Sequence, residues 1–210
     1  MMKRSISMMA AGAKRKAGVG DAPSAKRTPG HWSQGLLSSM DDPELRVDAD
    51  DKLVIIKDKY PKALHHFLVL PKEKIANLKK LKSEHIPLLK HIHKKGTEIA
   101  EKADQNLQFR FGYHAVPSMS HLHMHVISQD FNSPFLKTKK HWNSFTTEYF
   151  IDSKDIIDQL EELGRVETNT TENEQMLKRE LRCHKCSKTF STMPALKSHI
   201  VLHNASKKKS

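Results

Sequence analysis

The sequence predicts an α+β fold: a domain built on an antiparallel sheet with helices, followed by a small ββα module. Three observations predict it. Two short apolar runs and two segments that alternate with a two-residue period are typical of strands. One long stretch has apolar residues at the helical period. The only two cysteines of the chain lie near its end, followed by histidines, in a spacing typical of a small separate module.

Four segments are predicted to be strands. Residues 53–57 form a short apolar run, and residues 65–70 form a second one that Pro71 closes. Leu107, Phe109, Phe111 and Tyr113 alternate with other residues, and residues 121–128 alternate again. Such alternation places every second side chain on one face of a sheet.

Two segments are predicted to be helices. The first begins at Ser83, an N-cap residue, and its apolar residues recur at helical spacing (Ile86, Leu89, Ile92, Ile99 and Ala100). The second covers residues 154–163, with Ser153 as its N-cap and Gly164 as its end. Strands and helices joined by short loops favour the α+β class.

Changes in composition divide the chain. Residues 1–30 combine Gly, Ala, Ser, Pro and basic residues without an apolar period, so we expect a disordered basic tail. The globular domain is expected at 31–165. Residues 166–180 are polar and are interpreted as a linker or a solvated helix. The small module is expected at 181–205, before a basic tail at 206–210.

The chain is strongly basic. Its 36 Lys and Arg against 24 Asp and Glu give a net charge of +12, which favours polyanionic partners. No run approaches the ~18 apolar residues of a membrane span, and the N-terminus lacks the apolar stretch of a secretory signal. A soluble, intracellular protein that binds no membrane is expected.

Two basic clusters, Lys14-Arg15-Lys16 and Lys26-Arg27, have the pattern of a two-part nuclear import signal. They predict a nuclear protein and an acidic import carrier as partner. The alternative is a generic basic tail.

Three histidines, His121, His123 and His125, recur at the period of a strand. Leu122, Met124 and Val126 can then enter the core while three imidazoles share the opposite face. Imidazoles in this arrangement can bind a transition metal, or one of them can act as a nucleophile that its neighbours orient. A histidine-rich surface strand is the third interpretation.

Residues 121–127 match the signature His-φ-His-φ-His-φ-φ, where φ is apolar, and residues 58–63 and 66–71 match the strands of a nucleotide pocket. On these motifs the chain resembles the histidine-triad family. The resemblance implies an antiparallel sheet with helices, nucleotide hydrolysis, and His123 as nucleophile. It implies a covalent nucleotidyl-histidine that water hydrolyses, and chemistry without a metal.

Four flanking segments (31–36, 112–120, 127–131 and 139–145) narrow the resemblance. They resemble the branch of the family that removes AMP from DNA 5′ ends left by abortive ligation, which restores a 5′-phosphate for single-strand break repair. The resemblance covers about residues 31–203. Members of this branch often begin with a forkhead-associated domain, and none is recognised in these residues, so docking to phosphorylated repair scaffolds is not expected.

The resemblance also implies roles for single residues. His114 is the expected acid that protonates the leaving DNA phosphate. Asp58 is expected to contact the ribose hydroxyls. Trp32 is expected either to stack on an exposed base or to be an ordinary core residue. The remaining candidates hold phosphate oxygens, orient His123 or support that cluster (Lys62, His66, Ser118, His121 and His125).

The C-terminal module has the spacing of a zinc finger. Cys183 and Cys186 precede His199 and His203, with Phe190 and Leu196 at the positions of a small finger core. Two thiolates and two imidazoles one helical turn apart form a closed tetrahedral site, so a structural Zn²⁺ is predicted. A redox dithiol leaves the histidine spacing unexplained.

The finger's base-reading positions, Thr192, Ala195 and Ser198, include no long bidentate side chain. We therefore expect sequence-independent contact with the DNA backbone through Lys188, Lys197 and the C-terminal lysines; a protein–protein contact is the alternative. Two other functions remain open for the whole chain: hydrolysis of dinucleoside polyphosphates or RNA caps, and a non-catalytic zinc-finger DNA-binding factor.

Overall fold

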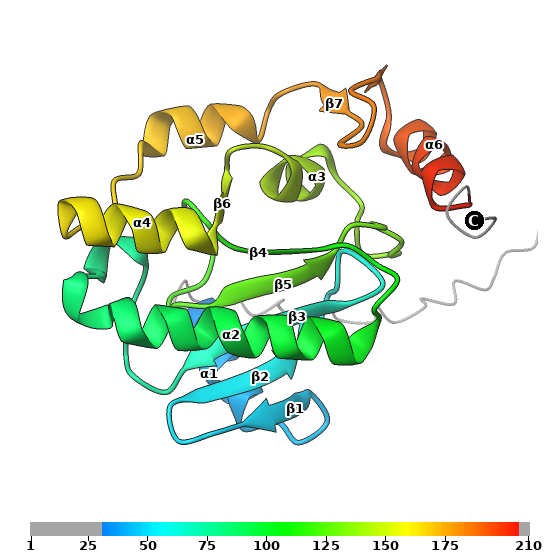
Figure 1. Ribbon diagram of the computed structural model, residues 1–210. Helices are drawn as coiled ribbons and strands as arrows, with labels where there is room; N and C mark the ends of the chain where they lie inside the picture. Colours follow the sequence, from blue (N-terminus) through cyan, green and yellow to red (C-terminus); the bar gives the residue numbers. More distant parts are fainter. Residues whose placement is uncertain (1–30, 206–210) are drawn as a thin grey trace, which may run out of the picture.

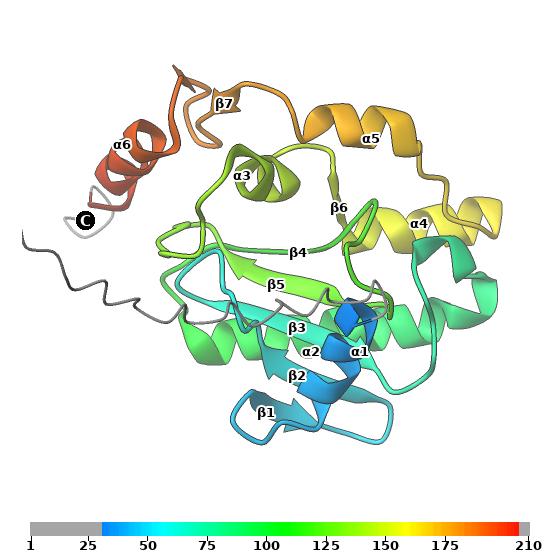
Figure 2. The same ribbon diagram turned by 180° about the vertical axis from the view of Figure 1, so that it is seen from behind.

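A computed structural model describes residues 31–205 (Figures 1 and 2). The two predicted tails and the basic clusters of the expected import signal lie outside these residues. The side chain of Trp32 is also outside the described part of the chain, so both of its expected roles stay predictions.

The centre of the fold is a six-stranded antiparallel sheet with the order β1-β2-β3-β5-β4-β6. The strands are β1 Arg46–Ala49, β2 Leu53–Lys57, β3 His66–Pro71, β4 Phe109–His114, β5 Met124–Ser128 and β6 Phe150–Asp152. The α+β class and four predicted strands are confirmed. Strand β1 is largely exposed and β6 has only three residues, so neither produces an apolar pattern.

One predicted strand boundary is wrong. The last strand was expected to begin at His121, but β5 begins at Met124. His121 has a φ of 85°, in the left-handed region that a residue within a strand does not adopt. Its N–H donates to the carbonyl of Ala76 rather than to a neighbouring strand.

Helices cover both faces of the sheet. Helices α2 (Ile86–Ala103) and α4 (Ser153–Leu163) pack on one face, which Figure 1 views, and α1 (His31–Met40) packs on the other, which Figure 2 views. Helix α3 (Lys139–Thr146) packs beside Phe150 of β6. No helix within residues 31–205 is long and apolar enough to cross a membrane.

Both predicted helix caps need correction. Ser83 begins a short 3₁₀ turn, η2 (Ser83–His85), and α2 starts only at Ile86 with Pro87 in its first turn. Ser153 is the first residue of α4 rather than its cap, because its buried hydroxyl is bonded to Nδ1 of His93 on α2. The predicted end of α4 is confirmed, since Gly164 adopts a left-handed φ of 68°.

The C-terminal module has the predicted ββα form, with β7 (Leu181–Arg182), β8 (Thr189–Phe190) and α6 (Met193–Ala205). It packs against the sheet domain: Leu181, Leu196 and Ile200 share an apolar cluster with Trp142 and Phe131. The indole N–H of Trp142 donates to the carbonyl of Arg182 at 2.9 Å. The finger is therefore attached to α3 and to the end of β5.

The segment between the sheet domain and the finger is not a free linker. Residues 166–180 contain a helix, α5 (Thr170–Met176), as one of the two interpretations expected. The side-chain amide of Asn143 donates to the carbonyls of Leu177 and Arg179, which fastens the chain to α3 just before the finger begins.

Candidate active site and zinc centre

Strand pairing brings three histidines to one face of the sheet. Leu68 of β3 and Gly112 of β4 both lie opposite His125, so these three residues share a face. His66 and His114 each lie two positions away on their strands and therefore share it too. The alternate residues, including Met124 and Val126, enter the core under α2, as the sequence predicted.

The expected nucleophile, His123, is buried and bonded through its ring. Its Nδ1 lies 2.8 Å from the backbone carbonyl of His121. A carbonyl oxygen only accepts, so Nδ1 carries the proton and Nε2 keeps its lone pair. Burial holds the pKa of His123 below its ordinary value, although the bond to His121 opposes this. The ring is therefore neutral near pH 7, with Nε2 free to attack.

His121 is placed by bonds to the loop before α2. Its Nε2 lies 2.7 Å from the carbonyl of Pro71, and its backbone N–H donates to Ala76. Together with its positive φ, these bonds set the direction of the carbonyl that His123 uses. Of the two expected roles for His121, this geometry fits orienting the nucleophile.

A second chain of hydrogen bonds sets the tautomer of His125. The backbone N–H of Lys62 donates to Nδ1 of His66 at 3.2 Å, so Nε2 of His66 carries the proton. That Nε2 lies 3.0 Å from Nδ1 of His125, which must accept. His125 is left with an N–H at Nε2 that has no hydrogen-bond partner within the described residues. Such a donor suits a phosphate oxygen.

Burial keeps these imidazoles neutral. It lowers the pKa of His66 to about 4 and that of His125 well below its ordinary value. It lowers the pKa of His114 to about 3, and the ring centre of His114 lies 4.4 Å from that of His125. For His114 to act as an acid, an anion must first bind beside it and favour its protonated form.

The other expected contacts surround this cluster. A carboxylate oxygen of Asp58 lies 3.5 Å from Nδ1 of His66, and the other accepts from the backbone N–H of Tyr60. The ammonium of Lys62 donates to the carbonyl of Tyr60, and burial lowers its pKa. Ser118 is exposed in the loop between β4 and β5. The structure thus gathers Asp58, Lys62 and the histidines at one site.

Two residues of the site were not predicted. A small pocket beside His123 is also lined by Asn77 and Tyr113. The hydroxyl of Tyr113 is buried without a hydrogen-bond partner among the described residues. In the sequence Tyr113 is simply one apolar position of an alternating strand, and Asn77 belongs to no motif, so no local signal marks either.

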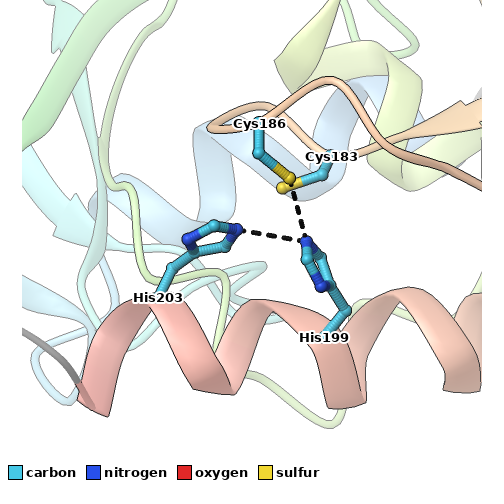
Figure 3. A group of neighbouring side chains, drawn as sticks. All are labelled: Cys183, Cys186, His199 and His203. Atoms are coloured by element: carbon cyan, nitrogen blue, oxygen red, sulfur yellow. Dashed lines mark hydrogen bonds between the residues drawn. The ribbon is translucent and has the colours of Figure 1, made fainter.

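The four predicted metal ligands converge (Figure 3). Their ligand atoms all lie within 4.8 Å of one another, and Nε2 of His199 lies 3.1 Å from both Sγ of Cys186 and Nε2 of His203. Ligands at ~2.0–2.3 Å from a tetrahedral Zn²⁺ lie about 3.3–3.7 Å apart, so the side chains fit that ion. The ammonium of Lys197 donates to the carbonyl of Ser133 at 2.7 Å and so faces the sheet domain, and its expected contact with DNA stays a prediction.

Comparisons with known proteins find a family match for the sheet domain and another for the finger. The family described as scavenger mRNA decapping enzyme C-term binding matches residues 31–141, and the C2HE / C2H2 / C2HC zinc-binding finger matches residues 146–205. Aprataxin of Gallus gallus is 54% identical over 182 residues, which are 86% of this chain and 57% of that protein. The aprataxin-like protein of Saccharomyces cerevisiae is 31% identical over 208 residues, covering 81% of this chain and 95% of that protein.

The chain belongs to the aprataxin family. Its fold agrees with that of a solved family member, aprataxin ortholog Hnt3 in complex with DNA, at a TM-score of 0.68 and 24% identity, covering 82% of this chain and 94% of that one. The chain spans about half the length of the vertebrate and ascidian aprataxins it matches.

Proposed function

We propose that this aprataxin-family chain hydrolyses DNA 5′-adenylates, releasing AMP and leaving a 5′-phosphate. The observation that carries the proposal is the state of His123: its Nδ1 proton is bonded to His121, and its Nε2 carries a lone pair beside a pocket. A nucleophile held in this tautomer next to a partnerless N–H of His125 suits attack on a phosphorus atom.

In the first step, Nε2 of His123 forms a bond to the α-phosphorus of the adenylate. The bond from that phosphorus to the bridging oxygen breaks, and its electron pair leaves on the DNA 5′-phosphate. The N–H at Nε2 of His125 donates to a non-bridging oxygen, where charge develops. His114, protonated once the anion is bound, gives its proton to the leaving phosphate.

In the second step, water attacks the same phosphorus and gives a proton to His114, which lost its own in the first step. The phosphorus–nitrogen bond breaks, and its electron pair returns to Nε2 of His123. AMP leaves, and His123 regains the neutral form that burial favours. Asp58 accepts hydrogen bonds from the ribose hydroxyls in this proposal. In this proposal the zinc ion takes no part in the chemistry, because Cys183, Cys186, His199 and His203 all belong to the finger. Asp58, His66 and His125 also lie close enough together to hold a metal ion, but the proposal uses the nitrogens of His66 and His125 for the hydrogen bond between them.

DNA as the substrate is supported by charge and by relatives. The chain carries a net charge of +12 and a finger packed directly on the sheet domain. Solved Hnt3 structures contain DNA, and one also contains guanosine. The finger's reading positions lack bidentate side chains, so we expect binding without sequence preference, as damaged ends require. A nuclear location, an import carrier and a role in single-strand break repair belong to the same proposal.

The test is incubation with a nicked duplex that carries a labelled 5′-AMP, with His123→Ala as the matched variant. We expect the unaltered chain to release AMP and leave 5′-phosphate DNA, and the variant to release none. If neither protein releases AMP while both bind the duplex, the hydrolase proposal is wrong and a non-catalytic DNA-binding factor takes its place.

A second candidate is hydrolysis of RNA caps or dinucleoside polyphosphates, which the decapping-enzyme family match favours. Comparing kcat/KM for adenylated DNA, a cap dinucleotide and diadenosine polyphosphate separates the two. The finger and the basic charge contribute little to a small substrate, so the first proposal requires a clear preference for DNA.

A further inference from the structure

Five exposed lysines lie in the segment that connects β3 to α2, and neither the motifs nor the finger accounts for them. They are Lys72, Lys74, Lys79, Lys80 and Lys82, here called the lysine rim. The segment 72–84 contains these five lysines and two glutamates, a net charge of +3. It connects β3 to α2 on the side of the molecule opposite to α6 in both views (Figures 1 and 2).

The rim is held in place by apolar residues between the lysines. Ile75, Leu78 and Leu81 are buried in the core under α2. The lysines at the intervening positions therefore project from a fixed support. An ordered array of cations loses less conformational entropy on binding an extended anion than a flexible tail does.

Backbone hydrogen bonds join the segment that carries the rim lysines to the triad segment. The carbonyl of Ile75 accepts from the N–H of Leu122 at 2.7 Å, and that of Ala76 accepts from His121 at 3.1 Å. Asn77 and Leu78 line the pocket beside His123. The lysines are thus neighbours in sequence of residues that touch the proposed reaction site.

Most of the rim's charge is free for a partner. Glu84 lies 3.7 Å from Lys82, and Glu73 lies 3.4 Å from His85. Within residues 31–205, no ion pair engages the ammonium of Lys72, Lys74 or Lys80. Exposed cations without carboxylate partners gain most from a phosphate, since no existing pair must be broken.

The rim and the finger lie at opposite ends of β5. The segment that carries the rim is bonded, through Ile75 and Ala76, to residues just before Met124, whereas the finger is bonded just after Ser128, through His184 to the carbonyl of Gln129 at 3.0 Å. Five strand residues at ~3.3 Å each place these two attachment points roughly 17 Å apart. Duplex DNA carries one phosphate charge per ~1.7 Å of axis, so such a span includes about ten phosphates.

We propose that the lysine rim binds the DNA backbone on the far side of the triad from the finger, so that the strand break is held from both sides of His123. The inference rests on the proposed function, because it names the surface that grips the same substrate. A small phosphate or nucleotide does not extend along the rim, so the partner is a duplex and not a free anion.

The test removes the three lysines that have no ion pair, as Lys72→Gln/Lys74→Gln/Lys80→Gln. The matched control is Lys94→Gln/Lys102→Gln/Lys154→Gln, which removes the same charge from exposed positions on α2 and α4, the helices that cover the face of the sheet opposite to the triad. For both and for the unaltered chain, Kd for an unadenylated nicked duplex is measured from about 50 to 200 mM salt, the range over which phosphate contacts dominate affinity.

For the rim variant we expect the slope of log K against log salt to fall by about 2–3, since each lost phosphate contact removes ~0.9. We expect Kd at ~0.15 M salt to weaken on the order of tenfold or more. The control variant should keep the original slope and the original melting temperature. Equal slopes for the rim and control variants overturn the inference, and so does a loss that occurs with duplex RNA but not with DNA.

AMP release by the unaltered chain is measured in parallel, so the two failures are distinguishable. If the unaltered chain releases AMP and the rim variant binds like the control, only the rim inference is wrong. If the unaltered chain releases no AMP, the proposed function is wrong, while the salt slopes still decide whether the rim binds DNA.

Discussion

Nε2 of His66 donates its proton to Nδ1 of His125 across 3.0 Å, joining residues 59 positions apart. His66 also accepts a hydrogen bond from the backbone N–H of Lys62. A backbone amide can only donate, so it sets the direction of both hydrogen bonds. The consequence is an N–H on the outer nitrogen of His125, the side available to a phosphate.

His66→Ala should therefore slow the chemistry without removing a group that touches substrate. Without its donor, the ring of His125 can adopt the other tautomer, and a lost buried hydrogen bond of ~1–3 kcal/mol corresponds to about fivefold to 150-fold in rate. His66→Gln, whose amide can donate to His125, should recover part of the loss. Single-turnover AMP release is the measurement, with DNA affinity expected to stay unchanged; a full rate for His66→Ala would contradict the role.

Acid should destabilise the fold through the same imidazoles. The pKa of His66 is about 4 and that of His114 about 3 in the folded chain, against ~6.5 when unfolded. Below pH ~6.5 these histidines bind protons in the unfolded chain but stay neutral in the folded chain. The free energy of unfolding therefore falls as pH drops from about 6.5 toward 4. Each such histidine contributes up to ~1.4 kcal/mol per pH unit.

Urea unfolding at several pH values checks this. His66→Gln should reduce the slope of unfolding free energy against pH by up to ~1.4 kcal/mol per pH unit, which corresponds to one proton. Loss of zinc in acid should affect the unaltered chain and the variant alike. The same slope in both proteins would show that His66 is not the group that titrates.

Gly112→Ala should weaken the pairing of β4 with β6. A Cβ at Gly112 would lie 2.3 Å from the backbone oxygen of Ile151 and 2.6 Å from the ring of Phe150. A backbone oxygen cannot turn away as a side chain can, so we expect a loss of about 1–3 kcal/mol or more.

Gly35→Ala is the control, because nothing lies within 4 Å of a Cβ at that position of α1. It should be neutral or stabilising by up to ~1 kcal/mol, from helix propensity. Urea midpoints of the two variants provide the comparison. Similar midpoints would mean that β6 moves aside at little cost.

Removal of zinc should loosen the finger from α3 while leaving the triad in place. Trp142 is fully buried under the finger and donates to Arg182, so a chelator should change its fluorescence and weaken DNA binding. Hydrolysis of a small adenylate should persist, because no triad bond involves a zinc ligand. If that hydrolysis stops as soon as zinc leaves and returns with zinc alone, the active site depends on the metal after all.

Local patterns predicted much of this fold. Short apolar runs predicted β2 and β3, alternation predicted β4 and β5, the helical period predicted α2, and Gly164 predicted the end of α4. Helix starts were less accurate, because the hydroxyl of Ser153 is engaged by His93 from another helix. Strand β6 and the pocket residue Asn77 have no local pattern at all, since the sheet edge and the loop before α2 create their surroundings.

By itself, the sequence determined which side chains are available and on which face each one lies, because strand period, helix period and the Cys-His spacing of the finger are properties of short segments. Only the tertiary structure decided what those side chains do to one another. The strand order β3-β5-β4 brings His66, His125 and His114 together, and the left-handed backbone of His121 aims the carbonyl that sets the tautomer of His123. Hydrogen bonds between residues far apart in the chain depend on how strands pair and loops close, and no short segment contains that information.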